Sequence, residues 1–270
     1  MIHIEFYGSS GSGKSTLYRW ANDYLFLKLG YRPGPQLEWR HMLADESIVR
    51  YRRPKLLRLA SLFAPAKAQH RLKEFFQKDS LDLISQGILA NHALLSCYLN
   101  QAYHAQPPAS QHEHRNMTEQ LQGFLALMAY HEAIKKRSGQ TVVMYSEGFY
   151  QRLARLLVEE AKQGSTIPRT CSANMPDVNL LFYVYAPPEI CYRRLCTRPK
   201  GFPGTMKHLE PSEMLARLKR SEHLHQAVLA IAADRGTIVK QLDNMTNLKH
   251  VLEQLSNDLD QHLSEYSARP

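Results

Sequence analysis

The 270-residue sequence predicts a single α/β domain of the P-loop type, in which parallel strands alternate with helices. Three observations lead to this fold class. A glycine-rich loop joins a strand pattern to a helix pattern near the N-terminus. Two later runs, Thr141–Tyr145 and Val178–Tyr185, are almost continuously apolar, as buried parallel strands are. Long helical patterns separate these runs, and together they predict a sheet with a large helical insertion.

The first strand and its loop carry the sharpest motif of the chain. Ile2, Ile4 and Phe6 recur with the period of a strand. The next residues, Gly8–Ser15, match G-x-x-x-x-G-K-[ST], the phosphate-binding loop or Walker A motif. Its glycines allow a backbone that turns successive N–H groups toward phosphate, and the following helix adds its positive end. The residues expected to bind the nucleotide are Gly8, Ser9, Ser10, Gly11, Ser12, Gly13, Lys14, Ser15 and Thr16.

Two side chains of this loop have specific roles in the motif. Lys14 supplies a cation for the β- and γ-phosphates, and Ser15 supplies a hydroxyl for Mg²⁺. ATP and Mg²⁺ are therefore the expected cofactors. A Gly/Ser linker that matches by accident is the alternative, but the flanking strand and helix patterns argue against it. The helix is expected to end at Gly30.

The segment after this helix is a weak candidate for a second strand, because Pro33 and Pro35 restrict it to an edge or a very short strand. It contains Glu38, Trp39 and Arg40, which could serve as base, stacking surface and anion clamp for an acceptor. A solvated corner between loop and helix is the alternative.

Residues 45–137 form the predicted helical insertion on the acceptor side. Helical patterns cover 48–63, 67–76, 80–101 and 119–137, and a proline pair with polar neighbours predicts a loop or lid over 104–116. Between Arg50 and Lys78 there are nine Lys or Arg residues against one acid. The histidines at 104, 112 and 114 are interpreted as part of a solvated loop, because no cysteine or paired carboxylate accompanies them.

A carboxylate follows the apolar run Thr141–Tyr145. Glu147 lies at the expected carboxyl end of a buried strand, where open α/β sheets bind their ligands. An acid at this place in P-loop proteins holds Mg²⁺, directly or through water, so Ser15 and Glu147 are the predicted metal residues. A surface acid at a strand end is the alternative. Arg152, in the next helix, is expected near the same cleft as a substrate-binding residue.

Cationic residues follow the apolar run Val178–Tyr185. Arg194 and Arg198 are one helical turn apart and precede a Gly/Pro segment, which predicts a mobile lid over 197–210. Such arginines neutralise the charge of a transferred phosphoryl group, although they could instead interact with the helix C-terminus. A helix over 211–234, a strand over 237–242 and a final helix complete the fold. Ser264–Pro270 is expected to fray.

This order of motifs resembles the nucleoside monophosphate kinase superfamily, and most closely thymidylate kinases and their deoxynucleoside kinase relatives. The residues that carry the resemblance are Gly8–Thr16, Ser146–Arg152, Pro176–Asp177 and Arg194–Arg198. The resemblance implies a five-stranded parallel sheet with helices on both faces. The chain departs from it at Glu147-Gly148-Phe149, where thymidylate kinases usually carry D-R-Y.

The expected function is ATP-dependent, Mg²⁺-requiring transfer of a phosphoryl group to a small molecule. The acceptor stays open between a nucleotide, a nucleoside and the hydroxyl of a sugar or other metabolite. If it is a hydroxyl, Glu38 or Glu147 is the candidate base. The rival class is a regulatory P-loop NTPase that binds nucleic acid or a membrane through the basic helices, and a P-loop sulfotransferase is a third option.

Composition gives weaker expectations about partners and location. The net charge of +9 is compatible with nucleic acid, anionic lipid or a phosphorylated substrate. Nucleic acid is not the expected partner, and a homodimer is left open. There is no secretory signal pattern and no apolar run approaching the ~20 residues that span a bilayer. Four cysteines form no C-x-x-C pair, so reduced thiols and a cytoplasmic location are expected.

Overall fold

Four parallel strands form one sheet in the computed structural model, which describes residues 1–30, 88–89, 91–96, 99, 111–135, 142–160, 172–199, 201–203, 206–207, 209–245 and 247–267. The strands are β1 (Ile2–Tyr7), β2 (Val142–Tyr145), β3 (Leu180–Tyr185) and β4 (Ile238–Asp243), in the spatial order β2-β1-β3-β4. The expectation of five strands is therefore wrong for the described residues. The weak strand expected within 31–40 lies outside them.

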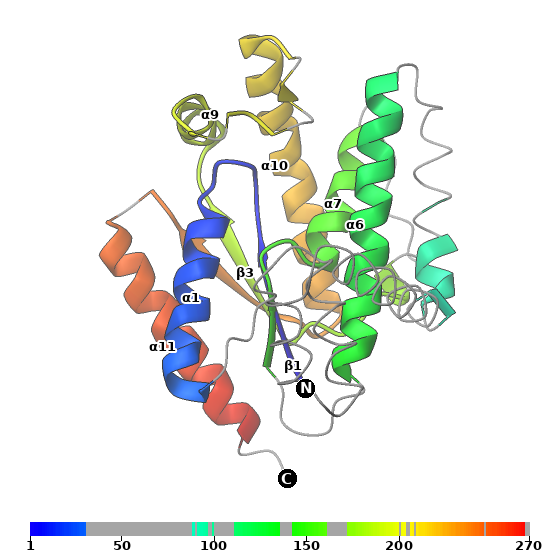
Figure 1. The fold of residues 1–270 in the computed structure, drawn as a ribbon. Coiled ribbons are helices and arrows are strands. Elements are labelled where there is room, and N and C mark those ends of the chain that lie inside the picture. Colours follow the sequence, from blue (N-terminus) through cyan, green and yellow to red (C-terminus); the bar gives the residue numbers. More distant parts are fainter. Residues whose placement is uncertain are drawn as a thin grey trace, which may run out of the picture.

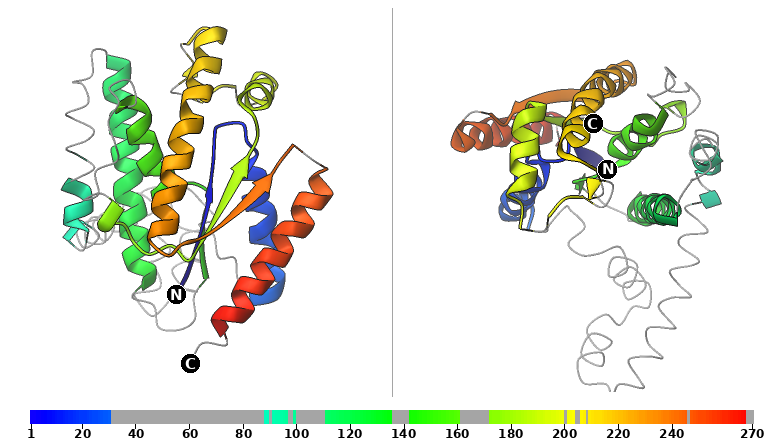
Figure 2. Two further views of the ribbon diagram at one scale, coloured as in Figure 1. Left: turned by 180° about the vertical axis from the view of Figure 1, so that it is seen from behind. Right: turned by 90° about the horizontal axis from the view of Figure 1, so that it is seen from above.

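Six helices surround the sheet within the described residues. They are α1 (Lys14–Leu29), α6 (Gln111–Lys135), α7 (Phe149–Glu160), α9 (Pro188–Cys196), α10 (Pro211–Asp234) and α11 (Leu248–Ser267). Helices α1 and α11 cover one face of the sheet, and α6, α7 and α10 cover the other (Figures 1 and 2). The α/β class with a parallel sheet between helices is thus confirmed. Its apolar strands are buried because helices cover both faces.

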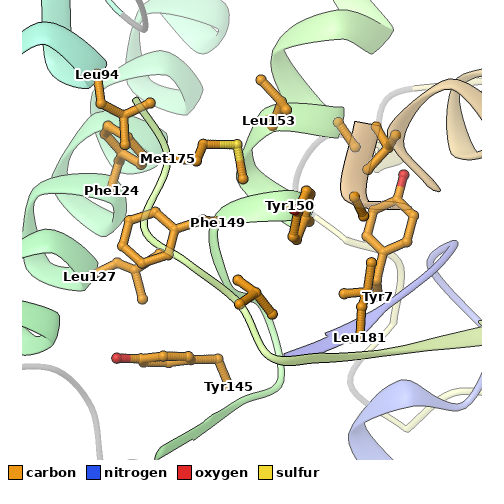
Figure 3. Packing of buried hydrophobic residues seen from close by; sticks show 14 of the residues in the cluster. Tyr7, Leu94, Phe124, Leu127, Tyr145, Phe149, Tyr150, Leu153, Met175 and Leu181 are labelled. Carbon is orange, nitrogen blue, oxygen red and sulfur yellow. The ribbon is translucent and has the colours of Figure 1, made fainter. Parts of the chain in front are cut away.

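Alternate side chains of β1 enter two different cores. Ile2, Ile4 and Phe6 pack against α1 and α11, whereas Tyr7 belongs to the cluster formed by α6, α7 and α10. Figure 3 shows this second cluster, in which Phe149 of α7 lies between α6 and the sheet. All six residues of β1 are buried, including its polar members. The strand is therefore central, with neither face available to solvent.

The strand order reverses at β1, which is the topological switch point of the sheet. The chain first forms β2 on one side of β1 and then β3 on the other side. Such a switch point opens a crevice at the carboxyl ends of the two strands, where open α/β sheets bind ligands. The glycine-rich loop follows β1 at this edge, as the sequence predicted.

Two boundaries differ from expectation. Helix α6 begins at Gln111, so the loop predicted over 104–116 is wrong from that residue onward. Its residues are polar, but after Pro108 they include no helix breaker and several good helix formers. Helix α11 continues to Ser267, where fraying was predicted from Ser264. The hydroxyl of Tyr266 contacts both the N-terminal amine and the carbonyl of Met1, which ties this end to β1.

Much of the predicted insertion, including the basic stretch 50–78, lies outside the described residues. Glu38, Trp39 and Arg40, which precede the insertion, also lie outside them. Among the helices that are described, none is both long enough and apolar enough to cross a membrane.

Candidate active site

The glycine-rich loop has the backbone geometry of an anion cradle. Gly8, Gly11 and Gly13 have φ angles of 143°, 87° and 99°. A φ of 99° is strained for any residue other than glycine, and a Cβ atom on Gly13 would also displace the amide nitrogen of Asn244. Gly13 is also the N-cap of α1, and no side chain caps that end. The helix therefore presents its positive end to the loop, which is the arrangement that favours phosphate.

The lysine of the motif lies over the loop itself. Lys14 Nζ donates to the carbonyl oxygens of Gly8 and Ser9 at 2.6 and 2.7 Å, and the residue is almost fully buried. Ser12 is buried, and no hydrogen-bond partner of its Oγ lies among the described residues. A buried hydroxyl of this kind needs a partner, and a phosphate oxygen would be one. The loop residues thus fit a nucleotide phosphate.

Two side chains hold the loop backbone by hydrogen bonds to the carbonyl of Ser12. Arg194 Nη1 and Asn244 Nδ2 both donate to the carbonyl of Ser12, at 3.2 and 2.6 Å. Arg194 Nη2 also donates to the carbonyl of Asn244 at 2.8 Å, which links α9 to the end of β4. In this arrangement Arg194 stabilises the loop as well as adding positive charge beside it. Its proposed action on a transferred phosphoryl group would require the guanidinium to change partners.

The other predicted site residues that the structure describes lie on four different parts of the fold. Ser15 and Glu147 are both exposed, at the start of α1 and just after β2, and their elements meet at the carboxyl edge of the sheet. Hydroxyl and carboxylate oxygens are ligand types that Mg²⁺ prefers. Arg198 is exposed beyond the end of α9. The guanidinium of Arg152 lies against Gly123 of α6, at the interface of α6 and α7.

The described part of the predicted lid, 197–210, packs on its neighbours. Met206 is buried in a small apolar cluster with Leu195 of α9 and Leu218 of α10, and Phe202 and Leu209 pack against it. The segment is thus tied to the helix that precedes it and to the helix that follows it. Opening of a lid here would have to expose this cluster.

Three polar side chains that support the site were not predicted. Gln151 of α7 accepts a hydrogen bond from the amide of Gly8 at 3.2 Å. Glu5 of β1 accepts from the amides of Phe149 and Tyr150 at the start of α7. His225 of α10 contacts Ser9 of the loop. No local motif marks these residues, because each acts on a partner more than 140 residues away.

Two buried histidines have strongly lowered pKa values. Burial lowers the pKa of His225 to about 3, and the charge of Lys14 acts in the same direction. Burial likewise lowers the pKa of His131 to about 3, helped by His3 and Lys135. Both imidazoles are therefore neutral in the folded protein at neutral pH, whereas in the unfolded chain they protonate near pH 6.5.

This difference predicts acid destabilisation. A lowered folded pKa means that the unfolded state binds more protons, so stability is complete above about pH 6.5 and is lost as the pH falls toward 3. Between about pH 7.5 and about pH 5, each histidine should lower the free energy of unfolding by roughly 2 kcal/mol. Urea unfolding across this range measures the loss. Because ordinary carboxyl groups stay ionised here, a flat profile would contradict the burial of both imidazoles as neutral groups.

No family model and no curated protein match the sequence. The matching solved structures include three of deoxyadenosine kinase from M. mycoides: with the products dCMP and a flexible dCDP, with dCTP, and with dATP. Their identities are 12%, 11% and 11%, and their TM-scores are 0.46, 0.45 and 0.45. The matches cover 96%, 96% and 95% of this chain and 98% of each kinase chain.

Deoxyadenosine kinase is a deoxynucleoside kinase, one of the groups that the motif order resembles.

Proposed function

We propose that this chain is an ATP-dependent, Mg²⁺-requiring kinase of a small-molecule acceptor. The observation that carries the proposal is the complete phosphate-binding loop at the carboxyl end of β1. Its glycines adopt positive φ angles, Lys14 lies over its carbonyls, and the uncapped start of α1 points at it. This constellation supports binding of a triphosphate rather than a structural turn.

The donor half of the reaction is assigned to particular groups. Lys14 would contact the β- and γ-phosphates, and the loop amides would bind phosphate oxygens. Mg²⁺, held by Ser15 and Glu147, would neutralise charge on the transferred group when bound. Arg198, which is exposed, would reach that group from the lid if the segment moves. Arg194 would first have to release Ser12 and Asn244.

The acceptor half is a proposal from the sequence alone. Glu38, Trp39 and Arg40 are proposed to bind the acceptor together with Arg152, under the helices of 45–137. Deoxynucleosides and nucleoside monophosphates head the candidates, because the motif order resembles thymidylate and deoxynucleoside kinases. If the acceptor group is a hydroxyl, Glu147 or Glu38 would accept its proton.

An acceptor screen tests the proposal. The purified chain is incubated with Mg-ATP and, in turn, with nucleosides, deoxynucleosides, nucleoside monophosphates, sugars and aminoalcohols, and ADP release is measured. Release that depends on one acceptor class and stops when EDTA removes the metal is expected. ADP release that ignores every acceptor but rises with DNA or anionic vesicles would contradict the proposal and favour a regulatory NTPase.

A further inference from the structure

Helix α10 meets the phosphate-binding loop through two polar side chains that the sequence motifs do not include. Ser221 and His225 lie one helical turn apart on the buried side of α10. The Oγ atom of Ser9 lies 2.8 Å from Nε2 of His225 and 3.3 Å from Oγ of Ser221. The other ring nitrogen, Nδ1 of His225, lies 2.6 Å from the hydroxyl of Tyr7, the residue that precedes the loop. Figure 3 shows the Tyr7 ring pointing from β1 toward α10.

The hydrogen bonds of this group run in one direction. Tyr7 is fully buried, and His225 Nδ1 is the acceptor that the structure places beside its hydroxyl, so the Tyr7 O–H donates to Nδ1. The proton of the imidazole is then on Nε2, which donates to Ser9. Ser221 donates to the carbonyl of Leu218 at 2.7 Å, and its oxygen is therefore free to accept from Ser9. Every hydroxyl in the group has an acceptor only with this tautomer.

The surroundings keep the imidazole neutral, as the tautomer requires. His225 is 4% exposed, and its ring packs against Tyr7 and Tyr183 at centroid distances of 5.0 and 5.8 Å. Burial opposes protonation of the ring, and the charge of the Lys14 ammonium group acts in the same direction. A neutral ring with one donor and one acceptor is therefore the form that fits this site.

Ser9 is fixed on both of its sides by this arrangement. Its hydroxyl is held by His225 and Ser221, and its carbonyl accepts from Lys14 Nζ at 2.7 Å and from the Ser12 amide at 3.2 Å. The loop start is thus tied to α10 as well as to its own lysine. A loop without the outer contact would have to order Ser9 at the moment of binding, at a cost in affinity.

We propose that His225 is a positioning residue for the phosphate-binding loop: through Nε2–H it holds Ser9, and with it the first turn of the loop, in the form that receives the nucleotide phosphates. This inference rests on the proposed function. The ring itself touches no phosphate in this role, and it acts through the hydroxyl of Ser9.

Two replacements of His225 separate this role from general stability. The amide nitrogen of glutamine can take the place of Nε2, so H225Q keeps a donor for Ser9 and loses the acceptor for Tyr7. Asparagine reaches only the place of Nδ1, so H225N keeps the Tyr7 contact and loses Ser9. The matched control is H223N, the same change at an exposed histidine of the same helix.

Binding of Mg-ATP is measured for all four proteins by isothermal titration calorimetry, with urea unfolding as a separate record of stability. We expect H225N to weaken binding about tenfold and H225Q to stay within about threefold of wild type, since one hydrogen bond to a buried partner separates them. H223N should bind as wild type does. In turnover assays the H225N change should appear in KM for ATP rather than in kcat.

The outcomes distinguish the two levels of the proposal. If the wild-type chain does not bind Mg-ATP, the proposed function fails and this inference fails with it. If the wild-type chain binds and H225N and H225Q have equal affinities, only the role of His225 is overturned. Should H225N not fold, Ser9→Ala removes the same contact from the loop side. Ser9→Ala is expected to weaken binding about tenfold, and unchanged binding would overturn the inference.

Discussion

Replacing Lys14 with methionine is expected to lower the rate of phosphoryl transfer at least ~100-fold, because it removes a cation aimed at the charge that develops in the transition state. Methionine has a similar length and no charge, so the buried position of the side chain can be kept. The fold should survive, since the carbonyl of Ser9 still accepts from the Ser12 amide. The measurement is kcat for acceptor-dependent ADP release, with Mg-ATP affinity recorded in parallel.

The control for Lys14 lies on the same helix. Lys28 is exposed near the end of α1 and pairs with Asp260 of α11, far along the helix from the loop. Lys28→Met removes one positive charge from the chain without touching the loop, and should leave turnover unchanged. Retained turnover in Lys14→Met would remove the assignment of the loop as donor site, whereas equal losses in both variants would point to net charge as the cause.

The elements that the sequence predicts correctly are those that depend on local sequence patterns. The loop motif, the helix that follows it and the apolar runs of β2 and β3 depend on residues within a few positions of one another. Gly13 and Lys14 were predicted from the motif and its flanking patterns, and both lie in the loop that follows β1, Gly13 with a positive φ and Lys14 bonded to a loop carbonyl.

The alternation in β1 was harder to interpret. I-H-I-E-F-Y has the period of a strand with one polar face, which normally faces solvent. Both faces are buried here, and His3 and Glu5 lie at 0% exposure. The two-residue period of a strand cannot show that a helix formed by residues 149–160 covers its polar face and supplies hydrogen-bond partners there. Residues such as Glu5 and His225 acquire their roles only when distant segments meet.

The departure of Glu147-Gly148-Phe149 from D-R-Y also has an explanation in the structure. The Glu5 carboxylate accepts hydrogen bonds from the amides of Phe149 and Tyr150 at 2.8 and 3.1 Å, and it therefore caps the start of α7. A Cβ atom at Gly148 would overlap this carboxylate. An arginine at this position has no room for its side chain as long as Glu5 is in place.

Gly148→Ala is accordingly expected to lower the free energy of unfolding by roughly 3 kcal/mol, the scale of overpacking in a buried site. The methyl group must displace the Glu5 carboxylate, which would then lose one or both amide partners without reaching solvent. Urea unfolding measures the change. Gly236→Ala is a useful comparison, because its φ of 78° is strained for alanine while no atom lies within 4 Å of the new methyl group. It should cost only about 1 kcal/mol.

A double-mutant cycle identifies the collision itself. Glu5→Ala alone should destabilise the protein by about 3 kcal/mol, since it leaves two buried amides at the start of α7 without an acceptor. In that background the methyl group added by Gly148→Ala has space, and the second substitution should cost almost nothing more. Additive losses in the double variant would show that the two residues do not compete for this space.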